Sequence, residues 1–262
     1  MFNILKSYAH IGIKRLFIYR IRIASQMLEM IVIPITLYYF FWKSIIDYNP
    51  MGYTLPEMIR YIIISNLILT FTHIHADQDL ERGIRNHNFG QSLLKPISFV
   101  TDIALKHIME SSIKFLILYV PIIVIVFVVM GNQIALSAIV LFIPSLIMAF
   151  VLNATLSFLI GFMSFWITET WGIAAIRNIL LSFLTGTVIP LDLFPQFLQK
   201  ILLMLPFPYI SYVPAKILCE PNFNMNIVTS GFAISSIWIC LFFIISYLLF
   251  TRGISKYTAR GV

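Results

Sequence analysis

The sequence predicts an all-α, polytopic membrane protein, and two observations carry this prediction. First, 60% of the residues are hydrophobic and only 11% are charged, whereas soluble domains carry about 25% charged residues. Second, the apolar residues gather into runs of about 20, which is the length that a helix needs to cross about 30 Å of hydrocarbon. We expect a single transmembrane domain over residues 1–262.

Six apolar runs are long enough to span the membrane. The last is the clearest, because Ile227 to Phe250 contains no charge. The fourth is overlong, since residues 135–167 are uncharged, and it predicts either a tilted helix or a break near Pro144 or Gly161. The fifth runs directly into a proline-rich segment. We place the six spans at residues 23–42, 58–76, 111–130, 137–165, 176–193 and 227–250.

The N-terminal segment, residues 1–20, precedes the first span and has a helical amphipathic pattern from residue 3 onward. Leu5 and Phe17 fall on its apolar face, and Lys6 and Lys14 fall on the opposite face. This pattern predicts a helix that lies in the inner membrane interface. No small-residue cleavage site follows the apolar run, so we do not expect a cleavable signal peptide.

Lysine and arginine placement predicts the orientation of the spans, because cytoplasmic loops carry an excess of these residues. Fourteen of the 18 fall on one side and four on the other, which puts both termini and the 77–107 connection in the cytoplasm. The net charge of +7 is then a topology signal and not a nucleic-acid surface. The fourteen are Lys6, Lys14, Arg15, Arg20, Arg22, Arg82, Arg85, Lys95, Lys106, Lys114, Arg177, Arg252, Lys256 and Arg260, and the four are Lys43, Arg60, Lys200 and Lys216.

The outer segment, Gly186 to Pro221, is apolar enough for a membrane but cannot be one straight helix. Proline removes a backbone donor and clashes with the preceding turn, and exposed backbone is not tolerated in lipid. We therefore expect short half-helices that fold back at the outer face as a re-entrant hairpin and act as an external gate. The prolines expected to shape this gate are Pro190, Pro195, Pro206, Pro208 and Pro214.

The largest cytoplasmic connection runs from Asp77 to His107 and is rich in charge. Its apolar pair, Leu93 and Leu94, is stopped by Pro96. This pattern is typical of a short helix that lies along the membrane and is presented to a soluble partner.

Two motifs together resemble the type-2 ABC transporter permeases: IRN…F…LLKPIS from Ile84 to Ser98, and IPLDLFP…LPFPY…P from Ile189 to Pro214. The resemblance covers nearly the whole chain and adds a coupling helix between spans 2 and 3. It implies the membrane half of an exporter, which is a homodimer or heterodimer of permeases over two ATPase subunits. We expect this exporter to lie in the cell membrane and to be bacterial. The residues implied to contact the ATPase are Arg85, Phe89, Leu93, Leu94, Lys95 and Pro96.

The sequence contains no motor for such an exporter. It has no G-x-x-x-x-G-K-[ST] phosphate loop and no soluble region large enough for a nucleotide fold. We therefore expect ATP and Mg to bind on a separate ATPase chain. It also has no G-x-S-x-G nucleophile elbow, so we expect no catalytic site. The substrates of the resembling family include drugs, peptides, lipids and polysaccharides, and a lining of Phe, Ile and Met favours an amphipathic one.

A metal or cofactor site is not expected. His73, His75 and Asp77 alternate, but on a helix residues two apart do not share a face, so only His73 and Asp77 would meet. Cys219 and Cys240 have no zinc or disulfide spacing.

Glu29 is the only acidic residue well inside a predicted span, and Gln26 lies on the same helix face. An intramembrane charge is costly, so these residues either line the translocation path or tie the first span to another helix. A buried acid and broken helices are also typical of ion- or proton-coupled secondary transporters, which is the alternative function. A non-transporting membrane immunity or scaffold protein is a third reading.

Overall fold

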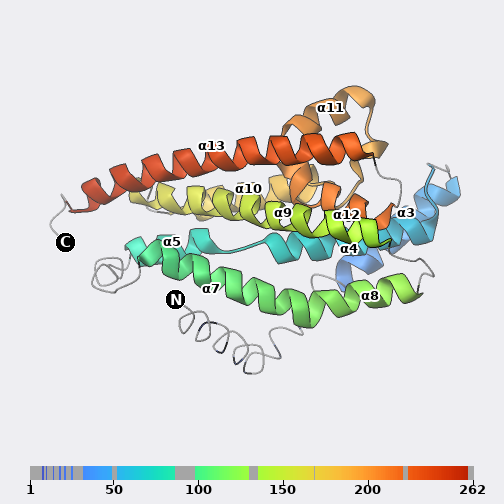
Figure 1. The fold of residues 1–262 in the computed structure, drawn as a ribbon, viewed down its shortest axis with the longest axis horizontal. Coiled ribbons are helices and arrows are strands. Elements are labelled where there is room, and N and C mark those ends of the chain that lie inside the picture. Colours follow the sequence, from blue (N-terminus) through green and yellow to red (C-terminus); the bar gives the residue numbers. More distant parts are fainter. Residues whose placement is uncertain are drawn as a thin grey trace.

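The protein forms an elongated helical bundle in the computed structural model (Figure 1). The structure describes residues 8, 10, 14, 18, 21, 25, 32–48, 52–85, 98–129, 135–167, 169–220 and 224–258. All regular elements within these residues are helices, as the sequence predicts. In chain order they are α3 (Ile33–Tyr48), α4 (Leu55–Thr72), α5 (Ala76–Arg85), α7 (Phe99–Lys114), η2 (Phe115–Tyr119), α8 (Val120–Val129), α9 (Leu136–Phe162), η3 (Met163–Phe165), α10 (Trp171–Leu184), η4 (Leu191–Leu193), α11 (Gln196–Met204), η5 (Phe207–Ile210), α12 (Tyr212–Cys219) and α13 (Met225–Thr258).

The second predicted span is the helix α4. It begins after Thr54, whose backbone N–H donates to the carboxylate of Glu57 at 2.9 Å, and Pro56 fits the first turn, where a helix needs no N–H donor. The helix ends at Thr72, before the predicted end at residue 76, and the chain is extended at His73.

The connection predicted over residues 77–107 is helical in much of its described part, which contains α5 and the start of α7. Charge suggested a loop, but Ala76, Leu80 and Ile84 recur at a spacing of four and are buried on one helix face. Acidic residues in the first turn of α5 and basic residues in its last turn also match the helix dipole. The predicted coupling helix falls mainly on residues 86–97, which lie outside the described residues.

The third predicted span, 111–130, is the C-terminal part of a longer helical run that begins at Phe99. Ser98 caps this run by accepting a hydrogen bond from the Thr101 N–H at 3.2 Å. The π-helical turn η2 ends at Tyr119, two residues before Pro121. Proline has no N–H for the preceding turn, so a local widening of the helix at this place follows from its chemistry.

The overlong fourth span forms a single helix, α9, that continues through Pro144 without a break. Regular α-helix ends at Phe162, next to Gly161, and η3 follows. The limits predicted for the fifth span, 176–193, are wrong. Helix α10 starts earlier, at Trp171, and ends at Leu184, because the chain turns at Gly186 with φ +75°.

The described part of the outer segment, residues 186–220, is broken into short helices, as its prolines predict. Proline stands at the residue before η4, α11 and η5, where its fixed φ suits the start of a helix. The three residues are Pro190, Pro195 and Pro206. Pro208 lies near the start of η5 and Pro214 in the first turn of α12, so none of the five gate prolines interrupts a helix interior.

Four described segments are long and apolar enough to cross a membrane. They correspond to predicted spans 2, 3, 4 and 6, and α10 is a shorter apolar helix. The N-terminal interfacial segment falls mostly outside the described residues, as does the first half of the first span, whereas α3 includes the second half of that span. The four segments are Leu55–Arg85, Phe99–Val129, Leu136–Phe165 and Met225–Ser255.

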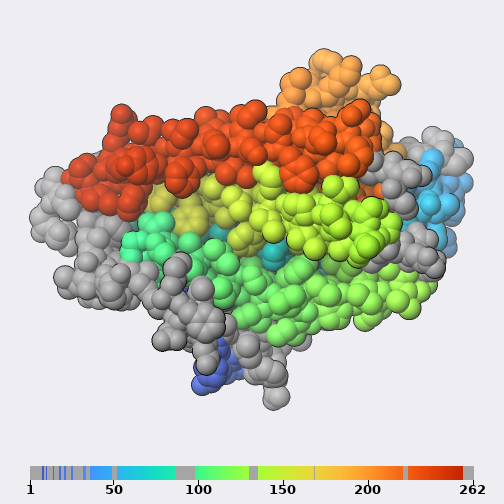
Figure 2. Space-filling model, viewed as in Figure 1, coloured from blue at the N-terminus to red at the C-terminus, as the bar shows by residue number. Residues whose placement is uncertain are grey.

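Helix α9 lies at the centre of the packing and contacts α4, α5, α12 and α13. Figure 2 shows α13 covering one side of α9 along much of the bundle. Among the described residues, two apolar cores result. A large one surrounds α4 and α12, and a smaller one lies where Leu80 of α5, Phe162 of α9 and Phe250 of α13 meet. The exposed apolar residues of α13, such as Ile237 and Phe243, are those that lipid would cover.

Candidate functional site

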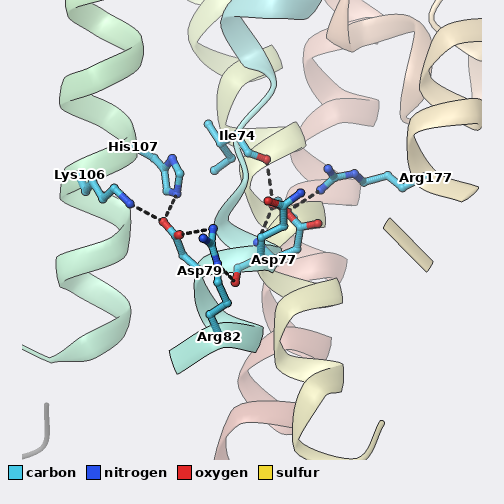
Figure 3. A network of polar contacts seen from close by, with 9 residues as sticks. Ile74, Asp77, Asp79, Arg82, Lys106, His107 and Arg177 are labelled. Atoms are coloured by element: carbon cyan, nitrogen blue, oxygen red, sulfur yellow. Dashed lines mark hydrogen bonds and ion pairs between the residues drawn. The ribbon is translucent and has the colours of Figure 1, made fainter. Parts of the chain in front are cut away.

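The polar residues of α5 form the main candidate site, because α5 leads directly to the predicted ATPase-contacting residues. Three acidic side chains, Asp77, Asp79 and Glu81, occur at alternate positions of this helix. Each one bonds to a different part of the bundle (Figure 3 shows the first two). We call these residues and their partners the α5 cluster.

Asp77 joins α5 to α9 and α10. Its Oδ1 accepts a hydrogen bond from the Ser157 hydroxyl at 2.9 Å and lies 3.5 Å from Nη1 of Arg177. The side chains of Asp77 and Arg177 are only 1% and 3% exposed, so both charges are removed from solvent. The Asp77 backbone N–H also donates to Ser157 at 3.2 Å.

Ser157 fixes the break between α4 and α5. Its hydroxyl lies 3.2 Å from the carbonyl of Ile74, a residue of the three-residue break, and 2.9 Å from Asp77. A carbonyl that no helix pairs therefore gains a contact inside the bundle, which an apolar site requires. The same serine thus holds both the break and the first turn of α5.

Asp79 joins α5 to α7. Its Oδ2 lies 2.6 Å from Nζ of Lys106 and 3.1 Å from Nε2 of His107. Its Oδ1 lies 3.1 Å from Arg82 on α5 itself. Figure 3 shows Lys106 and His107 reaching Asp79 from the neighbouring helix. Multiple charged donors on one half-buried carboxylate form a stronger link than an exposed ion pair.

Glu81 joins α5 to the start of α10. Its Oε2 accepts from the hydroxyl of Thr170 at 2.6 Å and from the backbone N–H of Thr170 at 3.3 Å. Thr170 is the residue before α10 and is 1% exposed. The next ion pair, Arg85 to Glu169 at 3.6 Å, is largely exposed on both sides.

His73 and His75 lie in the break between α4 and α5, so the prediction that they share a helix with Asp77 is wrong. The α4 helix ends one residue before His73, because the polar sequence that follows bonds to α9 and α10 instead. His73 Nε2 lies 3.0 Å from Asn178 Oδ1 and 3.3 Å from Arg177 Nη2. Within the described part of the chain, no three His, Cys, Asp or Glu residues come together as metal ligands.

The α5 cluster connects α5 mechanically to three other elements. Its contacts come from α7, from the C-terminal part of α9 and from the first half of α10. Breaking a buried pair by removing one partner costs about 3–5 kcal/mol, because the remaining charge stays desolvated. A displacement of α5 would therefore carry α7 and α10 with it, or else leave charges unpaired.

Of the predicted ATPase-contacting residues, the structure describes Arg85 at the C-terminal end of α5. The others lie outside the described residues: Phe89, Leu93, Leu94, Lys95 and Pro96. The predicted path residues Gln26 and Glu29 also lie outside them.

Sequence reasoning missed the acidic residues of α5 and the burial of Lys216. Asp79 and Arg82 at a spacing of three, and Lys216 and Glu220 at a spacing of four, were readable as helix pairs. The charge pattern predicts Lys216 as an outer-side topology signal, but its side chain is only 2% exposed.

Four described segments that are long and apolar enough to cross a membrane, packed as one helical bundle, define the class of multi-pass membrane proteins. The model of the family described as ABC-2 family transporter protein matches residues 30–261. The chain therefore belongs to the ABC-2 transporter family, and the resemblance to type-2 ABC permeases is confirmed. No curated protein matches the chain.

Proposed function

We propose that this chain is the membrane-spanning permease subunit of an ATP-driven ABC exporter. It moves an amphipathic substrate, such as a drug, a peptide or a lipid-like molecule, out of the cytoplasm. Family membership, four long apolar helical segments and the lack of a phosphate-loop motif in the sequence support this proposal. ATP and Mg then bind to a separate ATPase subunit, present in two copies.

The observation that carries the mechanism is the position of α5 between the predicted ATPase contact and the bundle. The helix ends at Arg85, which is the first of the predicted contact residues. Its acidic residues bond to α7, to α9 and to the start of α10. ATPase closure pushes on the coupling residues, and α5 transmits the displacement to α7 and α10. The spans then tilt at a dimer interface, and the outer segment opens.

The proposed assembly places two permeases side by side in the cell membrane, as a homodimer or a heterodimer, with both termini in the cytoplasm. Residues 186–220 then face the outside as the external gate. The distribution of lysine and arginine supports this orientation. The fold also supports this orientation, because α5 lies toward one end of the bundle and α11 and α12 lie toward the other (Figure 1).

The proposal is tested by co-purifying the chain with its candidate ATPase. Leu93→Asp, Leu94→Asp and Lys95→Glu, combined, should abolish the association and the permease-dependent part of ATP hydrolysis. The matched control is Leu198→Asp with Lys200→Glu on α11, two exposed positions in the proposed outer segment, which should leave both intact. If the wild-type chain binds no ATPase under any condition, the exporter proposal is wrong.

The same preparation distinguishes the secondary transporter. Reconstituted without an ATPase, such a carrier would move substrate on a proton gradient, and Glu29→Gln would abolish that movement. The exporter, in contrast, should move no substrate without ATP and its ATPase partner, in the wild-type chain and in Glu29→Gln alike.

A further inference from the structure

A second polar cluster surrounds the buried ammonium group of Lys216 on α12. Nζ of Lys216 lies 3.1 Å from Asp192 Oδ2 and pairs with Glu220, one turn further along. It also donates a hydrogen bond to the hydroxyl of Tyr53. The lysine side chain is 2% exposed, whereas the side chains of Asp192 and Glu220 are 32% and 40% exposed. The carboxylates thus face solvent and the cation faces the protein.

Three tyrosine rings line the inner side of this cluster. The ammonium nitrogen lies 4.7 Å from the ring centroid of Tyr53, 5.6 Å from that of Tyr61 and 5.9 Å from that of Tyr212. Aromatic faces within about 6 Å stabilise a cation, and more strongly when it is desolvated. Rings and carboxylates together form a cage that recognises an ammonium group, and the chain fills this cage with its own lysine.

The cage spans separate parts of the fold. Tyr53 precedes α4 and Tyr61 lies in its second turn. Asp192 belongs to η4, Tyr212 begins α12, and Glu220 directly follows that helix. The Tyr61 hydroxyl also donates to the carbonyl of Gly186 at 2.6 Å, where the outer segment begins. The cage therefore exists only while η4 and α12 are both packed against α4.

We propose that Lys216 is a positioning residue for transport. Through Asp192 it ties α12 to η4, and through Tyr53 and Tyr61 it latches this packed segment onto the start of α4, and it leaves its cage when residues 186–220 open. A desolvated ammonium group is favourable only while its partners surround it, so the contacts stabilise the closed arrangement alone. The role of this movement in transport rests on the proposed function, but the latch itself is testable without an ATPase.

Cys219 is a native reporter of opening. It lies on α12 three residues after Lys216 and is 6% exposed, and burial raises the pKa of its thiol to about 12. Both properties slow its reaction with a thiol reagent, because the thiolate is the reacting form. The other cysteine, Cys240, is exposed on α13 and is removed by Cys240→Ser.

The experiment measures the rate at which a membrane-impermeant maleimide labels Cys219 in the Cys240→Ser chain, reconstituted in lipid nanodiscs. Lys216→Met should raise the rate about tenfold or more, the factor that corresponds to about 1.4 kcal/mol of lost closed-state preference. Lys200→Met removes the same charge from an exposed position of α11 and should leave the rate unchanged.

Two further variants keep the test decisive if Lys216→Met does not fold. Asp192→Asn and Glu220→Gln alter partly exposed side chains, and each should also accelerate labelling. In Lys216→Ala, added n-propylammonium replaces the missing part of the side chain and should slow labelling again. Propan-1-ol has the same length without the charge and should not. A merely space-filling lysine would give no such difference between the two additives.

Unchanged labelling in folded Lys216→Met, or in both carboxylate variants, would overturn the latch, whatever transport does. Accelerated labelling supports it. If labelling accelerates but transport by the assembled exporter is unaffected, the latch stands and the proposed gate function of residues 186–220 fails. The two proposals are thereby distinguished.

Discussion

Asp77 and Arg177 form a buried ion pair between α5 and α10, with Oδ1 and Nη1 3.5 Å apart. Ser157 of α9 contacts the same carboxylate oxygen at 2.9 Å. Three helices thus meet at one carboxylate beside the break in the α4–α5 segment. This arrangement explains how a helix as polar as α5 is held against apolar spans, and it makes the pair sensitive to the loss of either partner.

Removing one member of this pair should destabilise the protein strongly. Asp77→Asn or Arg177→Met should each lower the free energy of unfolding by about 3–5 kcal/mol, because the other charge stays buried and unpaired. The double variant Asp77→Leu with Arg177→Met should recover most of that loss. Unfolding in mixed micelles with increasing denaturing detergent measures the differences.

The exposed pair of Arg85 and Glu169 provides the control. Its side chains are 55% and 70% exposed, so Glu169→Gln should change the free energy of unfolding by at most about 1 kcal/mol. Equal effects at the two pairs would show that burial of Asp77 and Arg177 does not govern their contribution.

Close packing of α5 on α9 leads to a second prediction. A Cβ at Gly161 would lie 2.5 Å from Leu80 Cδ1 and 3.0 Å from the Asp77 Cα. Gly161→Ala should therefore destabilise the protein by about 1–3 kcal/mol, the usual cost of overpacking. A Cβ added at Gly172 in α10 would meet no atom within 4 Å, so Gly172→Ala should be neutral or stabilising by up to about 1 kcal/mol. Thermal unfolding followed by size-exclusion chromatography compares the two, and a stable Gly161→Ala would contradict this packing.

Much of the fold was predictable because lipid imposes one rule on every span. A run of about 20 apolar residues must form a helix whatever its neighbours are, so spans 2, 3, 4 and 6 were found. Their ends were harder to predict. Helix α5 looks like a loop by charge, and only its contacts with Ser157, Lys106 and Thr170 show why its acids are tolerated. Those partners are distant in sequence.

The site was less predictable than the fold, because its contacts join residues that are distant in sequence. Proline chemistry is local, and it correctly indicated that residues 186–220 break into short helices. The environment of Lys216 is not local: Tyr53 and Asp192 reach it only after α4, η4 and α12 pack together. A lysine in a loop-like sequence carries no sign of such a cage.

The turn after α10 provides a third prediction. Gly186 has φ +75°, and a Cβ there would lie 2.4 Å from Leu191 Cδ1. Gly186→Ala should cost about 1–2 kcal/mol from the left-handed backbone alone, and more from the clash. Gly52 has φ +79°, and a Cβ added there would meet no atom within 4 Å. The variant Gly52→Ala therefore measures the backbone cost without a clash. Thermal unfolding of both variants should rank Gly186→Ala as the less stable, and the reverse order would contradict the packing of η4 against this turn.

Asp79 tests whether α5 transmits motion or only stabilises the bundle. Asp79→Asn weakens the contacts to Lys106 and His107 on α7, while the predicted ATPase-contacting residues are unchanged. The variant should still co-purify with the ATPase, but the stimulation of ATP hydrolysis by substrate should fall by about tenfold, the factor that matches about 1.4 kcal/mol of lost coupling. Arg82→Gln is the control. It removes an ion pair of Asp79 that lies within α5 and does not reach α7, so it should preserve the stimulation. Full stimulation in Asp79→Asn would show that movement reaches the bundle by a route other than the α5–α7 contact.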